Sequence, residues 1–221
     1  KFPEVVANTP ELLASHLAKA ERFSEAVDQW REAGIRATQV SSNHEATHHF
    51  DAALNLLQKE TSGLARDKRE LELQVPRALA MAALHGYASL KTGAAYERAF
   101  QLSQGMDSPP QLFQILYGLS TTRWMGDKFL EGLAIAKELV SYSDTAGDKS
   151  GHVIAHRTYG GAVVWLPDYE TSKVHLEKAI AAYDELNSHR FIEEYGNDPK
   201  AISLAMLGVA QAYRGFPDQA A

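Results

Sequence analysis

The hydrophobic and polar positions of this chain follow the period of an α-helix, and part of the pattern occurs more than once. Residues 45–54, EATHHFDAAL, place a small residue before histidine and a large apolar residue, followed by alanine and an aliphatic residue. Residues 171–180, TSKVHLEKAI, follow the same order, and residues 25–33, EAVDQWREA, keep the small, large apolar and small positions. Positions 0, +4 and +7 share one helical face, so each copy is predicted to pack one side of a helix against its neighbours. Repetition of this kind indicates a solenoid of helical hairpins.

Turn-forming residues divide the periodic stretches into predicted helices. These helices are expected at residues 10–21, 24–40, 43–59, 71–84, 94–104, 111–125, 128–145, 152–166, 169–187 and 200–214, with another beginning at Pro217. A polar linker is predicted at 60–69 and a longer polar insertion at 187–199. Pro76 removes a backbone donor inside one predicted helix, so we expect a kink or a late start there.

Short joints and small residues give the predicted helices a common geometry. Gly126-Asp127, Pro167-Asp168 and Gly215-Phe216 are short enough to connect antiparallel helices. Small residues stand twelve positions apart across the joints: Ala14 and Ala26, Gly34 and Ala46, Ala83 and Ala95, Ser120 and Gly132, Gly160 and Ser172, and Gly208 and Ala220. Small side chains at a helix crossing let two backbones approach closely.

These features resemble tetratricopeptide-like repeats, which carry small residues at corresponding places in each unit. The repeats here are unevenly spaced and longer than the usual unit of about 34 residues. We therefore predict an all-α, tetratricopeptide-like right-handed superhelix of antiparallel helical hairpins, forming a single domain over residues 1–221. The start at Lys1 without Met and the helix opening at Pro217 predict a fragment of a longer chain.

Composition and charge narrow the function classes. The sequence contains 22 Lys and Arg against 28 Asp and Glu, so its formal net charge is -6. It shows no stripe of basic residues of the kind that binds the phosphates of nucleic acids. No cysteine is present, which excludes disulfides, thiolate metal sites and thiol catalysis within these residues. No apolar run reaches the length of a membrane span, and no signal peptide opens the sequence. We expect a cytoplasmic protein without a membrane partner.

Nine histidines invite a metal hypothesis. The sequence His44-Glu45-Ala46-Thr47-His48 matches the H-E-x-x-H motif of zinc hydrolases, in which two histidines bind zinc and the glutamate acts as base. It begins at a predicted helix start, where Ala46 already fills a packing position. His152 and His156 have the same spacing, but neither pair has a predicted third ligand. We predict no catalytic residue, metal ligand or cofactor, and keep a zinc hydrolase using His44, Glu45 and His48 as an alternative.

Sequence position predicts packing or peptide-binding roles for several other side chains. His49 and His175 occupy the same repeat position, which favours packing between neighbouring helices. Arg123, Arg157 and Tyr159 lie on first helices of predicted hairpins and are candidates to line a groove, where repeat arrays bind peptides. The tryptophans are expected in the core: Trp30, Trp124 and Trp165.

Five segments, in this order, carry a resemblance to a known family. They are Pro10-Glu11-Leu12-Leu13-Ala14-Ser15-His16, then Glu25-Ala26-Val27 with Trp30 and Ala33-Gly34, then His175-Leu176-Glu177-Lys178-Ala179-Ile180, Tyr195-Gly196-Asn197-Asp198-Pro199 and Gly215-Phe216-Pro217-Asp218-Gln219-Ala220. The first resembles the segment that leads out of the ATPase module in bacterial multi-domain signalling ATPases. The others resemble the helical-repeat sensor region that follows. Many of those regulators carry a class III adenylate/guanylate cyclase domain, and others carry a DNA-binding output domain.

The resemblance implies a non-catalytic sensor or scaffold segment for protein–protein interaction or effector sensing in a signal-transduction ATPase, linked to an adenylate/guanylate cyclase. Its partner would be a protein or peptide, the parent chain's own ATPase or cyclase domains, or a small effector, without direct binding of nucleic acid. Neither a phosphate-binding G-x-x-x-x-G-K-[ST] motif nor a cyclase metal-carboxylate motif occurs in these residues, so catalysis would belong to other parts of the parent chain. A free-standing peptide-binding tetratricopeptide adaptor is the alternative.

The small-residue pattern makes a first testable prediction. If Gly160 lies at a helix crossing, the Gly160→Leu variant overfills it and lowers the free energy of unfolding by at least about 1–3 kcal/mol. Thermal denaturation followed by circular dichroism measures this loss. An unchanged melting temperature would show that Gly160 lies elsewhere.

Overall fold

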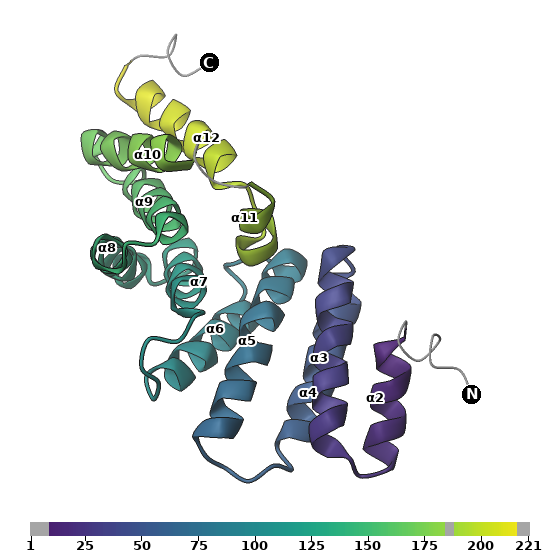
Figure 1. The fold of residues 1–221 in the computed structure, drawn as a ribbon. Coiled ribbons are helices and arrows are strands. Elements are labelled where there is room, and N and C mark those ends of the chain that lie inside the picture. Colours follow the sequence, from purple (N-terminus) through teal and green to yellow (C-terminus); the bar gives the residue numbers. More distant parts are fainter. Residues whose placement is uncertain (1–8, 184–187, 216–221) are drawn as a thin grey trace. The chain divides into compact units, whose positions relative to one another are not determined.

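The computed structural model describes residues 9–183 and 188–215, and this part of the chain contains α-helices and no strand (Figure 1). The helices are α2 (Pro10–Lys19), α3 (Phe23–Gln39), α4 (Asn43–Leu57), α5 (Leu64–His85), α6 (Leu90–Ser103), α7 (Leu112–Met125), α8 (Phe129–Ala146), α9 (Lys149–Val163), α10 (Tyr169–Tyr183), α11 (Ser188–Tyr195) and α12 (Pro199–Tyr213). The predicted all-α class is confirmed. None of these helices is both long and apolar enough to cross a bilayer. Phe216, the predicted helix at Pro217 and Ala220 lie outside the described residues.

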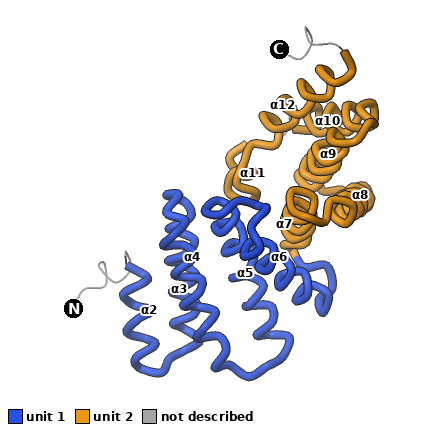
Figure 2. The backbone as a smooth tube through the Cα atoms, turned by 180° about the vertical axis from the view of Figure 1, so that it is seen from behind, with its two compact units in different colours: residues 1–109 blue, residues 110–221 orange. Residues whose placement is uncertain are grey.

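The chain divides into two compact units, residues 1–109 and residues 110–221 (Figure 2). Each unit buries its own set of apolar side chains. The single domain expected from the sequence stays a prediction.

In the first unit, each helix packs against the next one along the chain, from α2 to α6, and α3 also touches α5. Apolar residues of α3, α4 and α5 form one core cluster, which includes Val27, Phe50 and Leu73. The buried carboxylate of Glu70 on α5 accepts two hydrogen bonds from the guanidinium of Arg98 on α6, at 2.7 and 2.9 Å. This two-pronged ion pair fixes α6 against α5, because loss of Arg98 would leave a buried charge without its partner.

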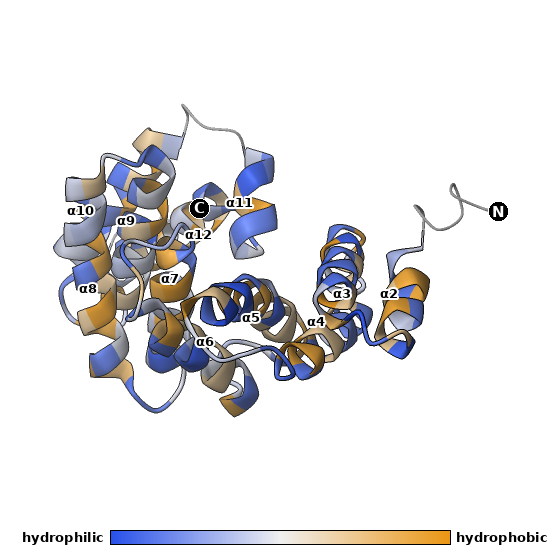
Figure 3. Ribbon diagram, turned by 60° about the horizontal axis from the view of Figure 1, so that its bottom comes forward, coloured by the Kyte–Doolittle hydropathy of each residue, from blue (hydrophilic) through white to orange (hydrophobic). Residues whose placement is uncertain are grey.

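Helix α9 is the centre of the second unit. It packs against α7, α8, α10 and α12, while α8 also packs on α7 and α10 also packs on α12. Hydrophobic and hydrophilic residues alternate along α8 (Figure 3), as expected of a helix with one face in solvent. Helix α9 is instead buried around most of its circumference.

Two of the predicted small-residue crossings are closed by a hydrogen bond between helices. The hydroxyl of Ser120 on α7 donates to the carbonyl oxygen of Gly132 on α8 at 2.8 Å. The hydroxyl of Ser172 on α10 donates to the carbonyl oxygen of Gly160 on α9 at 2.9 Å. All four residues are buried. The close crossings predicted at these two pairs are therefore confirmed.

The crossing predicted at Ala83 and Ala95 is wrong. Ala95 is buried, but Ala83 is exposed and its neighbour Ala82 is buried in its place. The connection between α5 and α6 comprises residues 86–89, one residue more than the connection 126–128 between α7 and α8. The longer connection shifts which residues of α5 face α6.

The late start predicted for the helix around Pro76 is also wrong. Helix α5 begins at Leu64, so most of the predicted polar linker is helical and Pro76 lies inside the helix. Residues 64–69 are mainly good helix formers. Pro76 deprives only the carbonyl of Glu72 of its helical donor, and Glu72 is an exposed residue that water can reach.

The polar insertion predicted at 187–199 contains helix α11. Phe191 and Tyr195 stand four residues apart on this helix and are both buried. Burial of these two aromatic side chains on one face therefore folds a segment whose remaining residues are polar apart from the exposed Ile192.

A side chain at Gly132 has no space in the crossing of α7 and α8. An ideal Cβ there would lie 2.4 Å from the backbone nitrogen of Trp124 and 2.7 Å from the carbonyl oxygen of Ser120. We expect Gly132→Ala to lower the free energy of unfolding by about 1–3 kcal/mol, measured by urea denaturation.

The control is Gly161→Ala on α9, where the new Cβ would meet only Cγ of Met206, at 4.0 Å. Because alanine has the higher helix propensity, this control should be neutral or stabilising. Equal losses from both substitutions would contradict the close crossing at Gly132.

Candidate functional site

Helix α9 carries the buried polar side chains around which the second unit is built. The side chain of Asp148 starts the helix by accepting a hydrogen bond from the backbone nitrogen of Ser150 at 3.1 Å. Further along, His156 and Arg157 are neighbours, with exposures of only 1% and 7%. Consecutive residues of an α-helix point about 100° apart. The two side chains therefore face different helices and form two separate clusters.

Arg157 is held by neutral partners. Its Nη2 donates to Oδ1 of Asn197 at 2.7 Å and lies 3.4 Å from the hydroxyl of Tyr117 on α7. Asn197 Nδ2 donates to the same hydroxyl at 3.1 Å, and the guanidinium carbon lies 5.1 Å from the centroid of the Tyr117 ring. Arg157 Nε is buried without a hydrogen-bond partner, and no carboxylate of the described residues pairs with this guanidinium. The charge is thus stabilised by hydrogen bonds and by the ring face instead of by an ion pair.

Asn197 reaches α9 because the segment between α11 and α12 is fixed on both sides. Tyr195 packs edge-on against Tyr117, with ring centroids 5.4 Å apart, and its burial raises the pKa of its hydroxyl. Asp198 caps α12 by accepting hydrogen bonds from two backbone amides of its first turn, at 2.8 and 3.3 Å. Pro199 is the first residue of α12. The segment Tyr195-Gly196-Asn197-Asp198-Pro199 is therefore the connection that holds α11 and α12 to α7 and α9.

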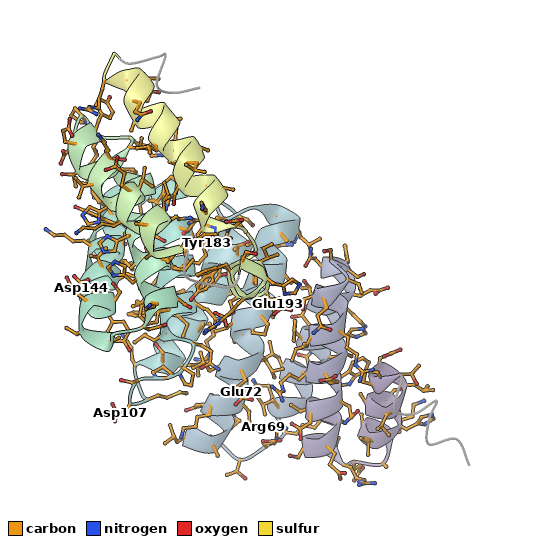
Figure 4. All side chains as sticks on the ribbon, turned by 45° about the horizontal axis from the view of Figure 1, so that its top comes forward. Arg69, Glu72, Asp107, Asp144, Tyr183 and Glu193 are labelled. Carbon is orange, nitrogen blue, oxygen red and sulfur yellow. The ribbon has the colours of Figure 1, made fainter. Side chains whose placement is uncertain are left out.

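His156 belongs to the second cluster. Its Nδ1 lies 2.8 Å from Nδ1 of His175 on α10, and its ring centroid is 4.1 Å from that of His152, one turn earlier on α9. Nδ1 of His152 lies 3.6 Å from Oδ1 of Asp144, an exposed residue in the last turn of α8 (Figure 4). Burial, followed by the charges of His152, His175 and Lys178, lowers the pKa of His156 to about 3, so this ring is neutral at pH 7. Burial also lowers the pKa of His175.

The second cluster brings together three side chains of the metal-binding type. One nitrogen of His152, one nitrogen of His156 and one carboxylate oxygen of Asp144 all lie within 4.8 Å of one another. The spacing of the two histidines was visible in the sequence, whereas the third donor was not. A signal for it exists, because Asp144 and His152 stand four residues on either side of Asp148, and Gly147 takes the positive φ of 66° that reverses the chain there.

The H-E-x-x-H sequence gains no third ligand among the described residues. His44, Glu45 and His48 lie on α4 and are all exposed. Glu45 accepts a hydrogen bond from the hydroxyl of Ser42 at 2.9 Å, and His48 lies edge-on to Trp30 with ring centroids 6.5 Å apart. Glu45 thus takes part in the start of α4.

The two histidines of the repeated pattern both lie between consecutive helices. His49 stacks on Trp30 of α3, with ring centroids 5.2 Å apart, and burial lowers its pKa. His175 of α10 contacts His156 and lies edge-on to Tyr159 of α9, at 4.7 Å between ring centroids. Both therefore have the packing role that their shared position indicates.

The remaining candidates differ in their exposure. Three residues are expected from the sequence to line a groove. Arg123 instead forms an ion pair with Glu131 of α8 at 3.2 Å, and Arg157 is buried. Of the three, only Tyr159 is neither buried nor part of an ion pair. Trp165 is 53% exposed, so the core position expected for it is wrong. It lies two residues beyond Val163, the last residue of α9, and so outside the helix.

The fold places this chain in the class of all-helical proteins. No protein-family model and no curated protein matches the sequence. Among solved structures, the crystal structure of BtubC (BKLC) from P. vanneervenii is similar, with a TM-score of 0.69 and 17% sequence identity over 98% of this chain and 84% of BtubC. Similarity at this level of identity shows a shared fold, and function has to be argued from the side chains.

The partnership of Arg157 with Asn197 can be measured. Asn197→Ala removes a hydrogen bond to a buried charge, so we expect the free energy of unfolding to fall by about 1.5–3 kcal/mol in urea denaturation. In the Arg157→Met background no charge is left unpaired, and the same change should cost clearly less.

Asn55→Ala, at an exposed position of α4, is the control and should change the free energy of unfolding by no more than about 0.5 kcal/mol. If Asn197→Ala costs the same with and without the guanidinium, the two residues are not coupled.

Proposed function

We propose that this chain is a non-catalytic scaffold and sensor of the tetratricopeptide-like kind, in which helical hairpins stack into a right-handed superhelix. The layering of the second unit is the observation that supports it most directly. Helix α9 touches both α7 and α12, α8 packs on α7 and α9, and α10 packs on α9 and α12. Hairpins that each contact only their neighbours are the building principle of repeat arrays.

The hydrogen-bonded crossings support the same proposal. Ser120 with Gly132 and Ser172 with Gly160 place a small residue of one helix against a small residue of the next, in two successive hairpins. A repeated unit is expected to show the same contact at the same spacing, and here a serine hydroxyl donates to a glycine carbonyl twice, with the two residues twelve positions apart. Side chains at these positions serve the crossing and are not available for chemistry.

The proposed setting is the sensor region of a bacterial signal-transduction ATPase linked to an adenylate or guanylate cyclase. This proposal is supported by the segment from Tyr195 to Pro199, which resembles the corresponding segment of that family. Several of its residues make different structural contacts. Tyr195 packs on α7, Asn197 binds the guanidinium on α9, and Asp198 caps α12. Because these residues have specific contacts, their resemblance to the family is stronger support than that of an amphipathic helix, whose pattern occurs in many helical proteins.

A surface for the partner is available on α12. Of its residues only Pro199, Ser203 and Ala210 are buried, while the apolar side chains of Leu204 and Tyr213 are exposed. Exposed apolar side chains on one helix favour contact with a protein or peptide, or with the parent chain's own ATPase or cyclase domain.

The size of the native gene product tests this proposal. An antibody raised against this segment should detect, in a lysate of the source cells, a band several times the 24.3 kDa of the segment, because the ATPase and output domains would share its polypeptide. A lysate of cells that lack the gene is the control and should show no band. A band near 24.3 kDa would overturn the signalling-ATPase proposal and leave a free-standing adaptor.

A further inference from the structure

Three side chains with metal-binding atoms converge at the connection between α8 and α9. Asp144 comes from the last turn of α8, and His152 and His156 are one turn apart on α9. Their nearest donor atoms lie within 4.8 Å of one another. Carboxylate oxygen and imidazole nitrogen are the ligands that zinc and related divalent ions take most readily when no thiolate is present.

One of the three donors is fixed, and the other two can adjust to it. His156 is buried, whereas the side chains of His152 and Asp144 are 33% and 58% exposed. Zn–N bonds of about 2.1 Å at tetrahedral angles separate neighbouring ligand atoms by about 3.4 Å, so the donors must approach one another slightly on binding. Asp144 is exposed, and the His152 ring is partly exposed although it lies against the ring of His156, so rotation of these two side chains can bring the donors closer.

The hydrogen bonding of His156 leaves one of its ring nitrogens for a metal ion. Its Nδ1 lies 2.8 Å from Nδ1 of His175, so one of the two rings donates a proton and the other accepts it. Nε2 of His156 is buried and has no hydrogen-bond partner among the described residues. When His156 donates from Nδ1, the lone pair on Nε2 is free. A metal-binding histidine ordinarily donates its second nitrogen in this way, which fixes the ring for the metal.

We infer that Asp144, His152 and His156 form a binding site for a divalent transition-metal ion of the zinc type. His175 accepts the hydrogen bond from His156 and acts as a positioning residue outside the ligand shell. Water completes the coordination, since these residues supply three protein ligands. The ion would tie the end of α8 to the start of α9 and so join two successive hairpins.

The chain contains its own comparison for this inference. His44 and His48 have the same spacing as His152 and His156, but they are exposed on α4, and residues 9–183 and 188–215 place no third donor beside them. A pair of exposed histidines four residues apart binds metal only as a two-point chelate. The difference in metal affinity between the two histidine pairs therefore measures the contribution of Asp144 and of the buried His156 ring.

The test uses the full chain without a polyhistidine tag, freed of metal by dialysis against a chelator. Titration with Co²⁺ is followed by visible absorption, and titration with Zn²⁺ by calorimetry and by the melting temperature. We expect one equivalent of each metal to bind, the visible bands of tetrahedral Co²⁺ to appear, and Zn²⁺ to raise the melting temperature.

Asp144→Asn and His152→Ala alter only partly exposed side chains, so both variants should fold, as circular dichroism will verify. Each should weaken Zn²⁺ binding by at least about tenfold, and His175→Leu should weaken it by about 10–100-fold while one-to-one stoichiometry is kept. The double variant His44→Ala/His48→Ala should bind as the unaltered chain does.

Three results would each overturn the inference. They are the absence of one-to-one Zn²⁺ binding, binding that Asp144→Asn and His152→Ala leave undiminished, and binding that is lost with His44 and His48 instead.

Discussion

The close approach of helix backbones sets the geometry of the second unit. A serine hydroxyl can donate to a carbonyl of the neighbouring helix only where the two helices nearly touch, and this happens at Gly132 and again at Gly160. These contacts bring α8 onto α7 and α10 onto α9. With α7 and α12 also against it, α9 has protein on nearly every side. The buried polar side chains of α9, such as those of His156 and Arg157, therefore depend on partners inside the protein.

The partners that α9 finds differ between its two clusters. The guanidinium of Arg157 receives an amide oxygen, a phenol and a ring face, and the imidazole of His156 receives a second imidazole. In both cases one nitrogen is left over: Nε of the arginine and Nε2 of the histidine. Buried nitrogens without partners are uncommon in folded proteins, and here two of them stand on adjacent residues of one helix.

Local sequence pattern predicts most of these helices and two of the crossings, because amphipathic spacing and turn residues act over a few positions. It does not predict features that depend on contacts between residues far apart in the sequence. Helix α11 depends on burying Phe191 and Tyr195 against side chains from other helices, because its only other apolar side chain, Ile192, is exposed. The spacing of His152 and His156 is visible in the sequence, but the closeness of Asp144 follows from how the chain reverses between α8 and α9. Arg157 is recognisable as a candidate, whereas its partner Asn197 stands forty residues away.

The burial of α9 has a consequence for any shortened version of this protein. Most amphipathic helices tolerate the loss of one neighbour, since the newly exposed strip can be made polar by substitution. In helix α9 only Lys149, His152 and Tyr159 are at least partly exposed, and the buried residues include an arginine and a histidine that need partners from different helices. A fragment that omitted α7, α8, α10 or the segment before α12 would present an apolar surface or an unpaired charge. We therefore expect helices α7 to α12 to be needed together for the second unit to fold.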